Sequence, residues 1–345
     1  MKYYQTVPKF PSDFKAVDKT YSLYGKLVKS NYPMPIPEVN LSKPDITFTF
    51  RGIVPKLENR PPDNHSRIWR QQQDSRLLRY YYSLGHMNEF RFSLNGSVVT
   101  FIQSWPEWRD TLFPLMNPVM AAAVTLQCGT ALHASSLVLN NTSTLIMGIS
   151  GAGKSTLSAA LAVQGLRVHS DDIAIIEWND NGIPVVMAGY PRIKIEPGLR
   201  EYIGLTGLSL IPIITENKKP GIPEDLELKI MNTHKEKWLP AEKLPGGFHS
   251  DAATLSEIII LGDRKKEIDM PQIERLRPVN AVMALTGHMY GREWLNRPGP
   301  GTLKVCTRLA ETVPVYRVYM PDNPGLLMQS AGYIRKKIIE NPGYD

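Results

Sequence analysis

Residues 148 to 157, GISGAGKSTL, constrain the fold of this chain more than any other stretch of its sequence. They contain the full pattern G-x-x-x-x-G-K-[ST], formed by Gly148, Gly153, Lys154 and Ser155. An apolar segment, STLIMGI, leads into the pattern, and the Ala-rich amphipathic segment STLSAALAVQG follows it and ends at Gly165. The sequence therefore predicts a strand, a glycine-rich turn and a helix in that order, which is a building unit of α/β folds.

The residue types in this turn indicate phosphate binding. Glycines let the backbone amides curl around a phosphate, the lysine reaches the outer phosphates, and the serine hydroxyl ligates Mg²⁺. A glycine-rich turn before an ordinary helix is the alternative, which the flanking strand and helix disfavour. We therefore predict a nucleoside triphosphate site with Mg²⁺. Its loop residues are Ser150, Gly151, Ala152, Gly153, Lys154, Ser155 and Thr156.

A pair of carboxylates, Asp171 and Asp172, follows the loop closely. The segment LRVHSDDIAIIEW predicts a strand with the pair in or beside it, and the spacing from Lys154 leaves room for only one short helix and a return strand. Neighbours on a strand point to opposite faces, so one carboxylate can face a metal ion and the other a different group. A carboxylate that accepts the proton of an attacking hydroxyl makes the site a kinase, whereas one that positions water makes it an NTPase.

The stretch LHASSLVLNNTSTLIMGISGAGKSTLSAALAVQGLRVHSDD resembles the core of the HPr kinase/phosphorylase family, whose P-loop fold is similar to that of phosphoenolpyruvate carboxykinase. Within that family, LHAS before the loop and GYPR at 189–192 look most similar to the HPr-kinase-like enzymes of lasso-peptide gene clusters. The resemblance is good over about residues 120 to 200, looser toward the C-terminus and weak before residue 110. It implies an α/β P-loop kinase that uses ATP and Mg²⁺ to phosphorylate a serine hydroxyl of a peptide, most closely the C-terminal serine of a lasso-peptide precursor.

The resemblance also implies roles for individual residues. Lys154 would hold the β- and γ-phosphates, and Ser155 would bind Mg²⁺. Asp172 matches the residue that accepts the proton in HPr kinases, and Asp171 would lie beside it as a metal ligand or a group behind the ligands. His133 matches an active-site histidine of the family, although a histidine at a strand start is more often structural.

The sequence departs from the family pattern at three places. Thr156 stands where HPr kinases usually have Glu, so any role of that acid is absent. Nothing resembles the glycine-rich loop that supplies their metal-binding Glu, and Glu196 and Glu201 are the nearest candidates. RPVN, at 277–280, is only weakly similar to the segment that HPr kinases use for dephosphorylation. The resemblance therefore supports a kinase activity more strongly than a phosphorylase activity.

Two cationic features have alternative interpretations. Arg192 of GYPR would clamp the transferred phosphoryl group or a substrate carboxylate, or it would be an ordinary surface arginine. The basic run of Arg67, Arg70, Arg76 and Arg79 indicates a solvated helix face, with a docking surface for an acidic peptide as the alternative.

Composition and segment pattern suggest two domains in a soluble chain. With 345 residues and 42% hydrophobic residues, the chain can bury two cores. We expect a mixed, strand-containing N-terminal domain at 1–114, which could form the peptide-docking groove, and a P-loop kinase domain at 115–345. Residues 212–250 are polar and interrupted by Pro and Gly, and we expect them to fold over the site when substrate binds.

Net charge limits the classes of binding partner, and cysteine usage indicates the cellular compartment. A formal charge of +7 fits an anionic ligand, but no nucleic-acid module is recognisable. Cys128 and Cys306 lack metal-ligand spacing, which favours a reducing cytoplasm, and the most apolar run, Pro118 to Leu126, is too short to span a bilayer. We therefore expect no nucleic-acid or membrane partner, and homo-oligomer formation stays open.

Two other functions remain open. The chain could phosphorylate a folded carrier protein such as HPr, or a small alcohol. It could also be a binding module that responds to nucleotide without appreciable turnover, although the acidic pair and His133 argue against this.

Overall fold

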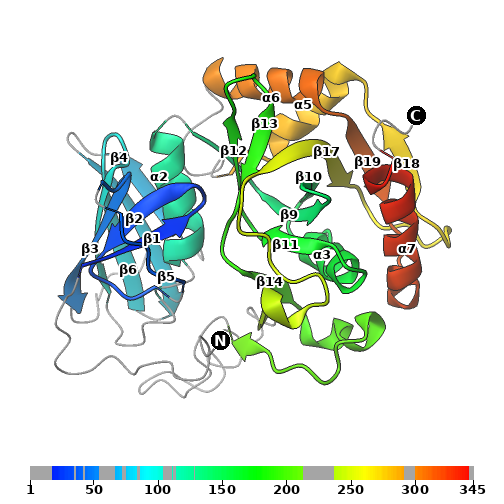
Figure 1. The fold of residues 1–345 in the computed structure, drawn as a ribbon, viewed down its shortest axis with the longest axis horizontal. Helices are drawn as coiled ribbons and strands as arrows, with labels where there is room; N and C mark the ends of the chain where they lie inside the picture. Colours follow the sequence, from blue (N-terminus) through cyan, green and yellow to red (C-terminus); the bar gives the residue numbers. More distant parts are fainter. Residues whose placement is uncertain are drawn as a thin grey trace. The chain divides into compact units, whose positions relative to one another are not determined.

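The computed structural model describes residues 18–34, 36–41, 43–53, 67–71, 75–83, 86–103, 111, 114–127, 129–212, 237–290 and 300–341. The chain is mixed α/β and divides into two compact units (Figure 1). The first unit comprises Met1–Cys128 with Pro212–Lys235, and the second comprises Gly129–Ile211 with Glu236–Asp345.

The first unit contains a seven-stranded mixed sheet in the order β1-β2-β3-β7-β6-β5-β4. Its strands are β1 (Lys19–Leu23), β2 (Lys26–Ser30), β3 (Ile46–Ile53), β4 (Arg67–Gln71), β5 (Ser75–Ser83), β6 (His86–Ser93) and β7 (Val98–Gln103). A turn at Asn95 and Gly96 joins β6 to β7, and these two strands pair antiparallel. The alternating stretch DITFTFRGIV contains β3.

The boundary between the units falls after Cys128, whereas the sequence placed it after residue 114. Between these positions lie a π-helix, η1 (Leu115–Val119), and the helix α2 (Met120–Leu126). The helix packs on the hairpin turn: a Cβ added at Gly96 would lie 2.4 Å from the carbonyl oxygen of Ala123 and 2.8 Å from the Cβ of Leu126. This close approach joins α2 to the first sheet.

The helical interpretation of the basic run is wrong. Arg67 and Arg70 lie on β4, and Arg76 and Arg79 lie on β5, which pairs antiparallel with β4. Arg79 donates a hydrogen bond from Nε to Glu89 Oε2 on β6, at 2.9 Å. Cross-strand pairing therefore governs this segment, not helical spacing.

The second unit is built on a nine-stranded sheet, which runs β11-β9-β10-β17-β13-β12-β8, with β19 beside β17 and β18 beside β19. The strands are β8 (Thr130–Leu132), β9 (Ala134–Leu139), β10 (Thr142–Met147), β11 (Arg167–Ser170), β12 (Ala174–Trp178), β13 (Pro184–Met187), β17 (Ala253–Leu261), β18 (Gln272–Arg275) and β19 (Val315–Tyr319). The strands β10, β17 and β19 run parallel, so their carboxyl ends meet at one edge of the sheet.

Helices cover both faces of this sheet (Figure 1). One core contains residues of α3 (Lys154–Val163) and α7 (Leu327–Ile334), and the other contains residues of α5 (Pro278–Gly287) and α6 (Pro300–Thr312). The central strand β10 contributes to both cores, with Ile146 in the first and Leu145 and Met147 in the second. Burial on both faces explains why the second half of this strand, Leu145–Met147, is apolar at every position.

A small sheet of β14 (Arg192–Ile195), β16 (Lys237–Pro240) and β15 (Ile211–Pro212) completes the second unit. The short helices of the unit are η2 (Pro197–Leu199), η3 (Glu201–Ile203), η4 (Ala241–Lys243), η5 (Pro324–Leu326) and the π-helix η6 (Arg335–Ile339). Residues 213–236, most of the segment that the sequence predicted would fold over the site, lie outside the described residues.

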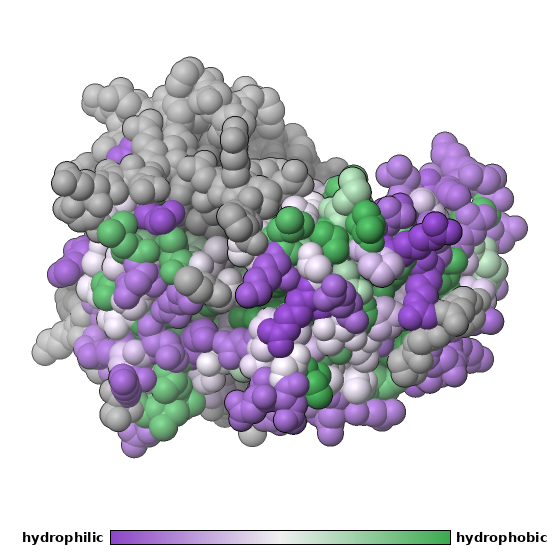
Figure 2. Space-filling model, turned by 90° about the horizontal axis from the view of Figure 1, so that it is seen from above, coloured by the Kyte–Doolittle hydropathy of each residue, from purple (hydrophilic) through white to green (hydrophobic). Residues whose placement is uncertain are grey.

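No helix within the described ranges is long and apolar enough to cross a membrane. On the face shown in Figure 2, hydrophilic residues predominate and hydrophobic residues form small separate groups.

Candidate active site

The glycine-rich turn joins β10 to α3, as the sequence predicted, and β9 and β10 pair antiparallel before it. Gly153 is the N-cap residue of α3 and has a φ of 98°, in the left-handed region. At Gly148 a Cβ would lie 3.2 Å from the Cβ of Leu261, so the loop starts close against β17. Glycine at these positions therefore lets the loop turn tightly at the edge where parallel strands end.

Lys154 begins α3 and points back into the loop. Its side chain is buried, and Nζ donates hydrogen bonds to the carbonyl oxygens of Gly148, at 3.0 Å, and Ile149, at 3.1 Å. The ammonium is thus held inside the curve of the loop, where it would meet the outer phosphates of a bound nucleotide.

Asp171 anchors the loop serine. Its Oδ1 accepts hydrogen bonds from Ser155 Oγ, at 2.9 Å, and Ser135 Oγ, at 2.6 Å, and its Oδ2 accepts one from the backbone N–H of Lys194, at 2.7 Å. The carboxylate is only 8% exposed. These contacts place a carboxylate and the hydroxyl of Ser155 side by side at the start of α3.

Asp172 has a left-handed backbone conformation, and a lysine and a histidine lie next to its carboxylate. It follows the end of β11 with a φ of 77°, so the strand breaks at the acidic pair. Lys194 Nζ donates to Asp172 Oδ1 at 2.8 Å, and His133 Nε2 lies 3.6 Å from the same oxygen. Burial raises the pKa of this carboxyl, but Lys194 and His133 outweigh that effect and hold the pKa well below its ordinary value. Asp172 is therefore ionised at neutral pH.

The residues fit Mg²⁺ as a partly hydrated ion. Among the described residues, no group of three or more His, Cys, Asp or Glu side chains is arranged to hold a metal ion. Mg²⁺ does not need such a cage, because it keeps several waters and binds through one or two carboxylates and the substrate phosphates. Asp171 and Ser155, whose oxygens lie 2.9 Å apart, supply that kind of donor set.

His133 lies between β8 and β9, next to the segment that follows α5. Its backbone N–H donates to the carbonyl oxygen of His288 at 2.9 Å, and its ring meets that of Tyr290 edge to face at 5.9 Å. Burial, with the nearby charges of Lys154 and His133, lowers the pKa of His288 to about 4, so this ring is neutral at pH 7. The site thus includes two residues, His288 and Tyr290, that the sequence gave no reason to select.

Arg192 is buried, so the surface-arginine alternative is wrong. Its guanidinium carbon lies 3.0 Å from the ring centroid of Trp238 and 4.1 Å from that of Tyr190, and the residue is 6% exposed. It shares β14 with Lys194, two residues further along the strand. The two rings meet edge to face at 74° and hold the guanidinium through cation–π contacts.

Other predicted positions lie nearby in sequence but are less enclosed. Glu196 and Glu201 are exposed after β14, and Glu201 starts η3. Thr156 lies in the first turn of α3, and Arg277 of RPVN is the N-cap residue of α5. Nothing places either glutamate in the hydrogen-bonded group around Asp171.

Sequence spacing could have indicated two of the missed residues. Lys194 lies two positions after Arg192 on β14, and Ser135 lies two positions after His133. Because side chains two apart on a strand share a face, each predicted residue pointed to a second one on its own face.

The matches of this chain to known proteins are confined to structure. No family model and no curated protein matches it. Among solved structures it is similar to the HPr(Ser) kinase/phosphatase from Coxiella burnetii, with 16% sequence identity and a TM-score of 0.32, over 62% of this chain and 94% of that one. A similarity of this size carries no functional argument, which depends on the residues of the site.

Proposed function

We propose that the protein is an ATP- and Mg²⁺-dependent kinase that transfers the γ-phosphoryl group to a serine hydroxyl of a peptide. The resemblance seen in the sequence further suggests the C-terminal serine of a lasso-peptide precursor as the acceptor. The observation that carries the proposal is the contact between the loop and the acidic pair. Ser155 donates to Asp171, and Asp172 lies next to it in a strained turn.

The proposed roles follow from charge and position. Lys154 and the loop amides would bind the phosphates, and Asp171 with Ser155 would hold Mg²⁺, which neutralises charge on the phosphates when bound. Asp172 would orient the serine hydroxyl and accept its proton. In phosphoryl transfer the bond to the nucleophile forms late, so positioning and charge matter more than base strength, and a carboxylate of low pKa suffices.

The test is phosphotransfer by the full chain. The protein is incubated with ATP, Mg²⁺ and peptides that end in serine, and mass spectrometry locates the added phosphate. Matched peptides ending in alanine serve as controls, and HPr and small alcohols test the other acceptors. Phosphate on the terminal serine supports the proposal, and phosphate only on HPr or on an alcohol shows a kinase with a different acceptor.

One observation favours the non-catalytic alternative. The ion pair between Lys194 and Asp172 satisfies the carboxylate in the described state, and Lys154 is bonded to the loop. A chain that binds ATP tightly but labels no hydroxyl acceptor would be a nucleotide-responsive binding module.

A further inference from the structure

We propose that a pocket beside the phosphate loop binds the nucleoside of the triphosphate, with Arg264 and Ser330 as its polar contacts. This inference rests on the proposed function, since it extends the same nucleotide away from the transferred phosphate. Its position, lining and one hydroxyl support it.

The pocket lies where three parallel strands end. The loop follows β10, Arg264 follows β17, and Met320 and Asn323 follow β19. Carboxyl ends of parallel strands are where open α/β sheets bind ligands. All the lining residues belong to the second unit.

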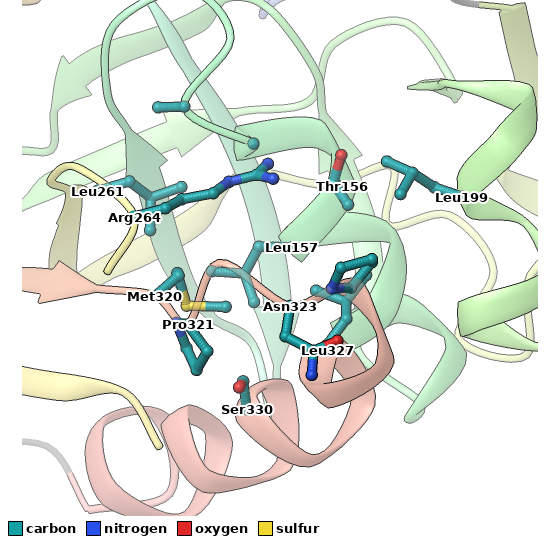
Figure 3. Close-up of a pocket in the computed structure, with 13 residues that line it drawn as sticks. Thr156, Leu157, Leu199, Leu261, Arg264, Met320, Pro321, Asn323, Leu327 and Ser330 are labelled. Carbon is teal, nitrogen blue, oxygen red and sulfur yellow. The ribbon is translucent and has the colours of Figure 1, made fainter. Parts of the chain in front are cut away.

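The lining is mostly apolar and continuous with the loop. Gly153 and Thr156 are among its lining residues. Leu199, Met320 and Leu327 supply apolar surface (Figure 3). Small-molecule sites typically combine such surface with a few placed polar groups. An apolar wall that adjoins a phosphate loop suits a nucleobase and its ribose, because they form the uncharged end of the nucleotide.

Ser330 supplies the first polar group. It is 1% exposed, lies in α7 and lines the pocket, and its Oγ is buried without a hydrogen-bond partner among the described residues. Figure 3 shows its side chain directed from α7 toward the pocket. A buried hydroxyl without a partner is costly, so a ligand atom that bonds to it would remove that cost.

Arg264 supplies the second polar group of the pocket. Its guanidinium lies against the loop, because a Cβ at Gly153 would come within 3.0 Å of it, and Figure 3 shows the side chain extending across the pocket toward Thr156. A planar guanidinium stacks on aromatic rings, so it can cover one face of a base.

The pocket lies on the correct side for a nucleoside. Asp171 and Asp172 bond to Ser155 and Lys194, which do not line the pocket, whereas Thr156, the next residue of α3, does. The pocket therefore adjoins the loop through residues other than the two that bond to the acidic pair, which we assign to the γ-phosphate end.

The test compares ATP with inorganic tripolyphosphate by calorimetry on the full chain with Mg²⁺. Wild-type protein should bind ATP at least about tenfold more tightly than tripolyphosphate. Ser330→Ala should weaken ATP about fivefold, leave tripolyphosphate within about twofold and not lower the melting temperature. Arg264→Ala should weaken ATP about fivefold or more. Lys266→Ala, which removes an exposed charge from the same turn, is its control and should change neither affinity by more than about twofold.

The outcomes separate this inference from the proposed function. Equal affinity for ATP and tripolyphosphate, or unchanged ATP affinity in both Ser330→Ala and Arg264→Ala, overturns the nucleoside pocket and leaves phosphate binding at the loop intact. Binding of neither ligand overturns the proposed function together with the pocket. An equal loss for both ligands in Arg264→Ala assigns the guanidinium to the phosphates and contradicts its place on the base.

Discussion

Asp172 combines backbone strain with charge pairing. A left-handed conformation costs an ordinary L-residue on the order of 1 kcal/mol, and here φ is 77°. The cost is offset by the ion pair with Lys194 and by the neighbouring His133. Strained residues held by their surroundings are typical of active sites, which is why this carboxylate, and not Asp171, is the better candidate for contact with the acceptor hydroxyl.

Replacing the carboxylate tests that assignment. Asp172→Asn should keep nucleotide affinity within a few-fold, because the loop and Asp171 bind the phosphates, and should lower kcat by about 10²-fold or more. Calorimetry and single-turnover phosphotransfer measure the two effects. Phosphotransfer at the wild-type rate would show that Asp172 does not accept the proton.

Lys194 gives a prediction about pH. It holds the pKa of Asp172 low, so its removal should raise that pKa. Since the ionised carboxylate is the active form, the acid limb of the kcat/KM profile should move to higher pH in Lys194→Ala. Lys194→Arg keeps the charge and is the matched control. Identical acid limbs in wild type and Lys194→Ala would show that Lys194 does not control the pKa of Asp172.

At the scale of elements, β14 links the acidic pair to two aromatic rings. Lys194 contacts both aspartates, while Arg192 is held between Tyr190 and Trp238. Arg192→Lys keeps the charge but loses the planar stacking surface, so the free energy of unfolding should fall by about 1–2 kcal/mol. Urea denaturation measures this change. If the unfolding free energy is unchanged while kcat falls more than tenfold, the side chain clamps the phosphoryl group, as the sequence suggested.

Local rules specify the elements that a sequence can predict. The turn at Asn140 and Asn141 has φ values of 49° and 64°, which asparagine tolerates, and the glycine pattern specifies the loop into α3. The basic run was wrongly predicted to be helical, because a spacing of three residues between arginines is compatible with a helix and also with two paired strands. Arg264 and Ser330 could not be placed, since they line the pocket beside the phosphate loop only once segments far apart in the sequence meet in the folded chain.

At the scale of the whole molecule, two buried groups in the second unit oppose each other as pH changes. Burial lowers the pKa of His169 to about 4, against a bond to the Asp251 carbonyl that raises it. Burial raises the pKa of Glu257, on β17, to about 7, although Ser256 and Thr144 bond to it. The neutral histidine contributes stability above pH 6.5 that is lost as pH falls toward 4. The protonated glutamate contributes stability below pH 4.5 that is lost as pH rises through 7.

Between pH 4.5 and 6.5 the slope from Glu257 therefore opposes that from His169, while His288, whose pKa is also about 4, adds a second slope of the same sign as His169. Glu257→Gln should expose the effect of both histidines. The glutamine imitates the protonated acid but does not titrate, so the variant should gain about 3 kcal/mol relative to wild type between pH 4 and pH 8. Its stability should also fall more steeply between pH 6.5 and 4.5 than that of wild type, in which Glu257 offsets one of the two histidines. Urea denaturation at pH 4, 5, 6, 7 and 8 measures both. Parallel profiles for variant and wild type would mean that Glu257 is ionised in the folded chain, which would require a cation close enough to stabilise its charge at the centre of the sheet.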